Sequence, residues 1–189
     1  MTTKNMGEDA AIIRILSPRK DRGIATLRLD KEMWNYFPKI NKVIKVPPSM
    51  MMGSWMGSDF TNDDLVQQTD LTEEYDLDLK ETADTYAITL TPRHDTVTVW
   101  GKIEYVIDKE RMIPIRELFY DDNGTRVRRL EFREPRDFSG RVLPSKLEMI
   151  PLNKEGHRTV ITYESLTFNP GELGPERLHA PSAQESVLR

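Results

Sequence analysis

The stretch "TVTVWGKIEYVI", residues 96–107, alternates polar and apolar side chains in the way that a β-strand does. Side chains such as Ile103 and Tyr105 point to one face, whereas Lys102 and Glu104 point to the other. The stretch therefore predicts a strand with one buried and one solvated face, as in an antiparallel sheet.

Trp100 interrupts this alternation, because it falls on the polar side of the expected strand beside Gly101. A glycine inside a strand marks a bulge or a close backbone approach. The pair predicts a bend at this point of the sheet.

On both sides of this stretch, short segments rich in β-branched and aromatic residues predict further strands. They are residues 24–29, 33–37, 43–46, 86–91, 112–120, 125–132, 146–150 and 158–168. Polar connections such as 108–111 and 121–124 are too short to hold a crossover helix, so neighbouring strands are antiparallel. We expect a mainly β (α+β) fold in which one strongly curved antiparallel sheet of about eight or nine strands forms an open or partial barrel, with short helices as a lid over an apolar cavity.

The composition indicates one ordinary domain. The 189 residues carry a net charge of -4 with acids and bases interspersed, which argues against a nucleic-acid partner. Residues 1–189 are expected to form a single domain with a core at about 10–170, and 171–189 to be a tail or edge segment. The chain contains no run of about 18 apolar residues, and residues 1–11 do not resemble a secretory signal.

The sequence offers no motif for catalysis or metal binding. It contains no cysteine, which excludes disulfides, thiolate ligands and a cysteine nucleophile. His94, His157 and His179 are isolated from one another. The sequence "GSWMG", residues 53–57, places its serine directly after the first glycine rather than at the centre of a nucleophile elbow. We predict no enzyme activity, no cofactor and no metal.

A segment that we call the methionine strip concentrates flexible apolar side chains after residue 49. Its members are Met50, Met51, Met52, Trp55, Met56 and Phe60. These thioethers have three interpretations: soft ligands for Cu(I), core filling, or a wall that adapts to a variable apolar guest. Together with Trp34 and Phe37, the strip is our predicted hydrophobic binding site.

Polar and small residues inside and after the strip have structural roles in this interpretation. Gly53 and Gly57, the latter followed by Ser58, allow sharp turns. Asp59 is a turn former, and Asp64 supplies negative charge to the first turn of a short helix that begins near residue 61.

The chain resembles the LolA-like outer-membrane lipoprotein-sorting proteins of Gram-negative bacteria. The resemblance is carried by residues 17–27, 33–39 and 49–65, and further by 107–109, 113–116, 119–121 and 140–144. It implies a half-barrel of antiparallel strands capped by helices, with an apolar cavity that shields acyl chains during transfer across the periplasm. Such proteins usually begin with a signal peptide and an amphipathic helix, and neither is recognisable before Asp9.

From this resemblance we expect a periplasmic carrier of lipoproteins or lipids that performs no covalent chemistry. Its expected partners are lipoprotein acyl chains or free lipid, together with membrane proteins that donate or accept them. The alternative is an envelope protein–protein interaction module that carries no lipid and uses the aromatic and methionine residues as a docking patch.

Overall fold

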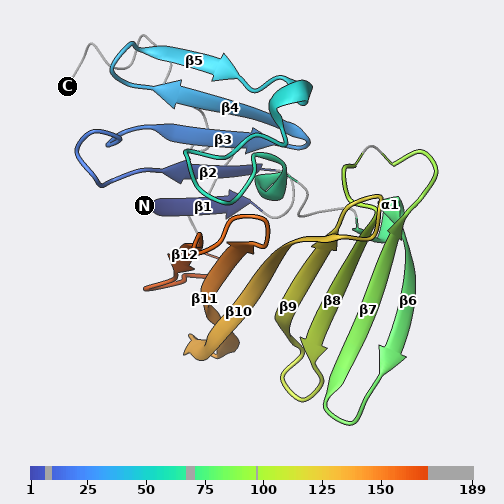
Figure 1. Ribbon diagram of the computed structural model, residues 1–189. Helices are drawn as coiled ribbons and strands as arrows, with labels where there is room; N and C mark the ends of the chain where they lie inside the picture. The colour runs from blue at the N-terminus through green and yellow to red at the C-terminus, as the bar shows by residue number, and fades with distance from the viewer. Residues whose placement is uncertain (7–9, 67–70, 97, 170–189) are drawn as a thin grey trace. The chain divides into compact units, whose positions relative to one another are not determined.

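The computed structural model describes residues 1–6, 10–66, 71–96 and 98–169, and these residues are mainly β (Figure 1). Their strands form two antiparallel sheets, one of five strands and one of seven. The chain divides into two compact units, each built around one sheet. The first unit draws on Met1–Ser54 and Thr61–Thr69, and the second on Trp55–Phe60 and Asp70–Phe168.

The five-stranded sheet is a meander in which each strand pairs with the next one along the chain. It consists of β1 (Thr2–Met6), β2 (Ala10–Arg14), β3 (Ala25–Leu29), β4 (Glu32–Phe37) and β5 (Lys42–Lys45). Ala10, Ile12 and Leu27 lie together on one face with Met6 packed against them. They form a small apolar core, which explains the alternation of buried and less buried positions along β2.

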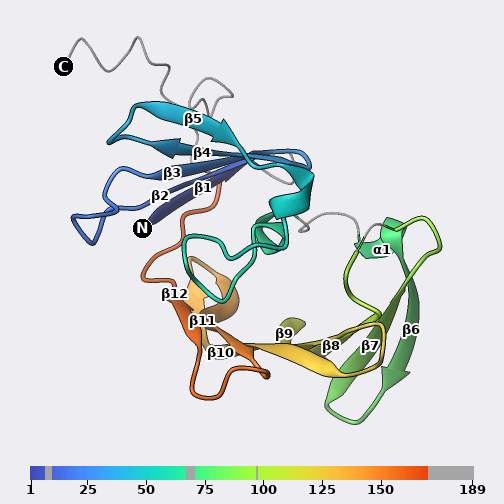
Figure 2. The ribbon, with the colours of Figure 1, turned by 45° about the horizontal axis from the view of Figure 1, so that its top comes forward.

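The seven-stranded sheet is a second meander, with the order β12-β11-β10-β9-β8-β7-β6 (Figure 2). The α-helix α1 (Leu71–Glu74) precedes it. Its strands are β6 (Tyr75–Glu81), β7 (Thr85–Pro92), β8 (Lys102–Asp108), β9 (Ile113–Tyr120), β10 (Arg126–Phe138), β11 (Arg141–Pro151) and β12 (Thr159–Thr162).

The single sheet that we expected from the sequence is therefore wrong, because the strands divide between two sheets. The division follows β5, where Pro47 and Pro48 lie directly after the strand and open a 3₁₀ helix at Pro48–Met50. Proline has no backbone N–H to donate to a neighbouring strand, so the meander ends there. The half-barrel curvature and the single-domain organisation stay predictions, and residues 171–189 lie outside the described residues.

The short helix expected near residue 61 is a 3₁₀ helix at Asp63–Leu65. The Asp64 backbone N–H donates to the Thr61 hydroxyl at 3.2 Å, and the Asp64 carboxylate accepts from the Thr61 N–H at 2.7 Å. This reciprocal pair has the hydrogen-bond pattern of a capping box, but it lies one residue before the N-cap, which is Asn62. Within the described residues, no helix is long and apolar enough to cross a membrane.

Candidate functional site

One face of the seven-stranded sheet is apolar, and we call it the apolar face. The strand register places one residue of each strand in each cross-strand row, so that rows two residues apart share a face. The first row joins Leu77, Leu90, Ile103 and Phe119, and the second joins Leu79, Ile88, Tyr105, Glu117, Leu130 and Met149. Tyr86, Ile107, Phe132, Leu147 and Ile161 lie on the same face beyond them.

The exposure of these side chains changes across the sheet. Ile103, Phe119 and Met149 are buried, whereas Leu77 and Leu79 on the edge strand β6 are 48% and 59% exposed. Two neighbouring leucines on one face of an edge strand form an exposed apolar surface, whose hydration is unfavourable. This surface is suited to an apolar ligand.

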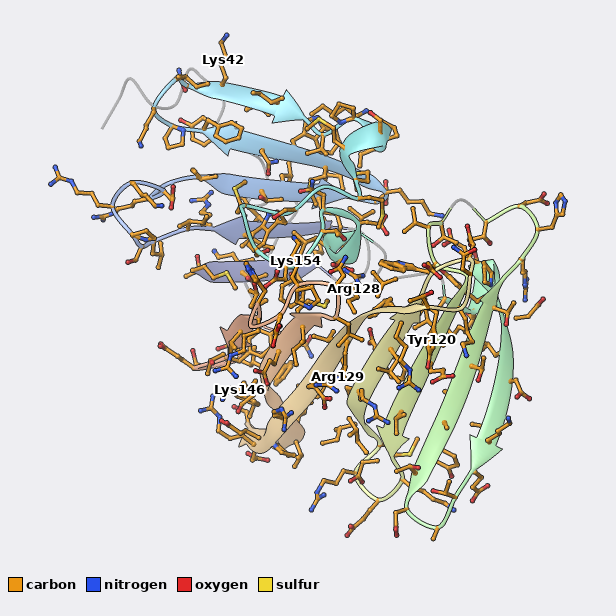
Figure 3. The ribbon with its side chains drawn as sticks, viewed as in Figure 1. Lys42, Tyr120, Arg128, Arg129, Lys146 and Lys154 are labelled. Carbon is orange, nitrogen blue, oxygen red and sulfur yellow. The ribbon has the colours of Figure 1, made fainter. Side chains whose placement is uncertain are left out.

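An arginine lies between two aromatic rings at one end of the apolar face. The Arg128 guanidinium is 4.4 Å from the centroid of the Trp100 ring and 4.2 Å from that of Phe119. The two rings are tilted, with their centroids 5.1 Å apart. Figure 3 shows Arg128 on β10. Cation–π contacts with the two rings offset part of the hydration free energy that a guanidinium loses on burial.

The placement of Trp100 corrects the sequence interpretation. Trp100 precedes β8, is 6% exposed and packs on Phe119, so it belongs to the apolar side rather than to the polar one. A Cβ atom on Gly101 would lie 2.5 Å from the backbone oxygen of Asp121. The predicted irregularity is thus a close approach of the Gly101 backbone to the turn at Asp121. Trp100 precedes the regular strand, so its side chain does not follow the alternation of β8.

Tyr105 and Glu117 are a polar pair within the apolar face, directly opposite each other on β8 and β9. The Tyr105 ring contacts Phe132, with 6.3 Å between the ring centroids. Burial of the hydroxyl, followed by the charge of Glu117 and the hydrogen bond to it, raises the pKa of Tyr105 above its ordinary value. The pair places a carboxylate among apolar side chains.

We expect Tyr105→Phe to reduce the loss of stability at alkaline pH. A raised pKa in the folded state means that the tyrosine's contribution is complete below its ordinary pKa of about 10 and is lost as the pH rises through the folded-state value. The free energy of unfolding of both proteins is measured by urea titration at about pH 8 and about pH 11. An equal loss in wild type and variant would show that Tyr105 is not responsible.

The opposite face of the same sheet is charged. The Glu131 carboxylate pairs with Arg129 at 2.9 Å, and Glu148 pairs with Arg133 at 3.3 Å and with Arg158 at 3.0 Å. Tyr120 donates to Glu104 at 2.7 Å. Tyr120, Arg129 and Lys146 are labelled in Figure 3. This face carries an ion-pair network, so the two faces of the sheet differ in chemical character.

Burial would raise the pKa of Glu104, but hydrogen bonds from Lys102 and Tyr120, with the charges of Lys102 and Arg126, lower it overall. The carboxylate therefore stays ionised on the charged face.

The structure places the methionine strip in different environments. Met50 is 59% exposed, Met51, Met52 and Met56 are half-buried, and Trp55 and Phe60 are each 6% exposed. Met50, Met51 and Met52 belong to the first unit, whereas Trp55, Met56 and Phe60 belong to the second. The strip is therefore divided into two groups, one in each unit.

The second group forms a tight turn. The Trp55 backbone N–H donates to the Phe60 carbonyl at 2.8 Å, and the Ser58 hydroxyl donates to the Trp55 carbonyl at 2.6 Å. Met56 and Gly57 have positive φ angles of 51° and 76°. In the first group, the Asn62 side-chain amide donates to the carbonyls of Met50 and Gly53 at 3.0 and 3.3 Å.

Asp59 fastens this turn to the seven-stranded sheet. The Thr159 hydroxyl donates to the Asp59 carboxylate at 2.8 Å and accepts from the Asp59 backbone N–H at 2.9 Å. Thr159 on β12 pairs with Met149 in the register, so it lies on the same face as the apolar rows. The turn that carries Trp55 and Phe60 is thus held at the β12 edge of the apolar face.

Trp34 and Phe37 are not brought together. They are three residues apart on β4, so their side chains lie on opposite faces of the five-stranded sheet. Phe37 lines a small pocket with Pro38 and Ile24. These two residues cannot line one continuous wall on this sheet.

The sequence interpretation missed the contribution of β6 to the apolar face. The strands predicted from the sequence do not include residues 75–81. The alternation of Tyr75, Leu77 and Leu79 with Asp76 and Asp78 was the signal, since it has the period of a half-buried strand. Within the described parts of the chain, no three histidine, aspartate or glutamate side chains gather in a way that could hold a metal.

Two antiparallel sheets, one of them with an apolar and a charged face, define a mainly β protein. A family model described as "Uncharacterized protein" matches residues 7–172, and the chain belongs to that family. No curated protein sequence matches the chain.

Solved structures confirm the resemblance in fold to LolA-like proteins. An outer membrane lipoprotein-sorting protein domain from Vibrio parahaemolyticus is 20% identical with a TM-score of 0.81, over 99% of this chain and 81% of that one. A DUF1329 family protein from Desulfovibrio piger is 21% identical with a TM-score of 0.74, over 90% and 77%. A LolA superfamily protein from Nitrosomonas europaea is 18% identical with a TM-score of 0.63, over 87% and 77%.

Proposed function

We propose that the protein is a periplasmic carrier that binds the acyl chains of lipoproteins or of free lipid on the apolar face of its seven-stranded sheet, and that it performs no covalent chemistry. The observation that carries the proposal is the apolar face itself, with exposed Leu77 and Leu79 leading to the half-exposed Ile88 and Tyr105. The fold that the chain shares with LolA-like proteins supports the same conclusion. We also propose that the sheet curves into the half-barrel predicted from the sequence.

The energetics favour an acyl ligand. Each methylene removed from water contributes roughly 0.8 kcal/mol, so a long acyl chain gains about 10 kcal/mol before the costs of association. Contact with one apolar face and the turn held by Asp59 supplies part of this gain. A separate pocket of about 300 Å³ at the hairpin ends is lined by Asp84, Asp108, Lys109 and Glu110 with Ala83, and its polar lining does not suit an acyl chain.

We expect Leu79→Asp to weaken binding of a fluorescent fatty acid by about tenfold or more, because a carboxylate on the apolar face must be desolvated against the ligand. Leu79 is 59% exposed, so the variant should fold. Lys80→Asp is the matched control: Lys80 is exposed and follows Leu79 on β6, but its side chain lies on the opposite face of that strand. Affinity is measured by fluorescence titration of delipidated protein.

Absence of saturable binding by the wild type, or equal loss in the two variants, would contradict the proposal. Mass spectrometry of purified protein for co-purified lipid is an independent check. Met51→Asp tests the first strip group, Met50, Met51 and Met52, which we propose as a separate hydrophobic contact for acyl chains in the first unit. If neither Leu79→Asp nor Met51→Asp weakens lipid binding, and the protein instead co-purifies with a protein partner, the interaction-module alternative replaces the carrier.

A further inference from the structure

Two loops lie at the same end of the five-stranded sheet, the β2–β3 loop of residues 15–24 and the β4–β5 turn of residues 38–41 (Figure 1). Gly23 brings them together: it has a φ of +88°, and a Cβ atom there would lie 3.2 Å from Cγ of Pro38. The Gly23 backbone N–H donates to the Ile15 carbonyl at 2.8 Å, and the Tyr36 hydroxyl donates to the Asn41 side chain at 3.2 Å. The two loops are therefore adjacent.

A pocket of about 190 Å³ lies between these loops. Half-buried Ile24, Phe37 and Pro38 line it together with Asp21, and exposed basic residues complete the lining, namely Lys20, Arg22 and Lys39. It is smaller than the roughly 300–1,000 Å³ of typical small-molecule pockets, so it has room for a compact polar group and not for a whole lipid.

The charge of this loop end is opposite to that of the chain. Residues 15–24 and 37–42 contain five basic residues and one acid, Asp21, whereas the whole chain carries -4. The Lys20 ammonium group is 3.9 Å from the Asp21 carboxylate, and its side chain is 78% exposed. Lys42 extends from the start of β5 in Figure 3. The remaining basic residues are Arg19, Arg22 and Lys39.

Exposed aliphatic side chains accompany the charges. Leu16 is 53% exposed and Ile40 is 58% exposed, one in each loop. Basic residues beside exposed aliphatic ones are the combination that binds the interface of an anionic bilayer, where charge meets the headgroups and the aliphatic groups enter the acyl boundary. An acidic protein would be matched by the charges but leaves the exposed aliphatic pair unexplained.

We propose that this loop end docks on anionic phospholipid bilayers, with the pocket taking one phosphate-containing headgroup between Lys20, Arg22 and Lys39. Docking involves the five-stranded sheet and does not require the apolar face of the seven-stranded sheet. It goes beyond acyl-chain binding because it assigns a membrane-contact surface to the protein.

The test is co-sedimentation of the full chain with vesicles of phosphatidylglycerol and phosphatidylcholine in equal parts, and with vesicles of phosphatidylcholine alone. We expect binding to the anionic vesicles that weakens as salt is raised, because salt screens exposed charges. Lys20→Gln, Arg22→Gln and Lys39→Gln combined should weaken it by at least about tenfold. The matched control combines Lys4→Gln, Lys80→Gln and Lys154→Gln, three exposed lysines elsewhere, and should bind like the wild type.

Ile40→Asp tests the aliphatic component and should also reduce vesicle binding. Absence of binding to anionic vesicles, or equal losses in the two triple variants, would overturn the proposal. So would full competition by inorganic phosphate, which would indicate a free-phosphate site, or binding to polyglutamate in place of vesicles, which would indicate an acidic protein partner. The loop variants should keep the fatty-acid affinity of the wild type, and Leu79→Asp should keep its vesicle binding. The two proposals can therefore be tested independently.

Discussion

Replacing Met149 by alanine is expected to lower the free energy of unfolding by about 2–5 kcal/mol. Met149 is 1% exposed, and its register partners are Leu130 on β10 and Thr159 on β12. Removal of its thioether leaves a cavity that the sheet backbone cannot close, so the loss includes both the transfer free energy and the lost contacts. Met149 lies within the apolar face, so the same variant should disturb acyl binding.

Urea unfolding followed by tryptophan fluorescence measures this effect, with Met50→Ala as the control. Met50 is 59% exposed, so its replacement should change the free energy of unfolding by less than about 0.5 kcal/mol. If the two variants lose similar stability, Met149 is not the packing centre that its burial indicates.

Gly101→Ala should destabilise the protein by about 3 kcal/mol, at the upper end of overpacking effects. The added Cβ would lie 2.5 Å from the Asp121 backbone oxygen and 2.8 Å from the Asp122 Cα. These are backbone atoms, which cannot rotate away, so the turn after β9 must move. The displacement would also disturb the contact of Trp100 with Phe119.

The control for Gly101→Ala is Gly124→Asn in the neighbouring turn. Gly124 has open space around its Cα and a φ of +75°, a conformation that asparagine tolerates better than other side chains. We expect a loss below about 1 kcal/mol, measured by the same urea titration. A Gly101→Ala protein as stable as this control would show that the backbone accommodates the Cβ.

The strands were predictable where alternation is strong and the turns are polar. The stretch 96–107 correctly identified β8, although the strand begins only at Lys102, because Gly101 packs against the turn at Asp121. The first two strands, β1 and β2, were not predicted from the sequence. For β1 the reason is that it carries mostly exposed polar residues, so its sequence has no apolar period. Pairing with β2 determines its structure, and local sequence does not contain that information.

The division into two sheets was not predictable from alternation, because a periodic pattern identifies strands and not their partners. The same limit applies to the candidate site. Local spacing grouped Met50 with Trp55, yet the two belong to different units. Leu79 and Met149 lie in one cross-strand row, but they are linked only through the register of the intervening strands.

The tie between Asp59 and Thr159 joins residues 100 positions apart. Closing a loop of this length has a high entropic cost, so we expect the turn at Trp55–Phe60 to reach its final position only after β12 has paired with β11. In the finished protein the tie depends on β12, which has four residues. Short edge strands open at low free-energy cost, so fraying at this one edge would release the turn and leave the other strands paired.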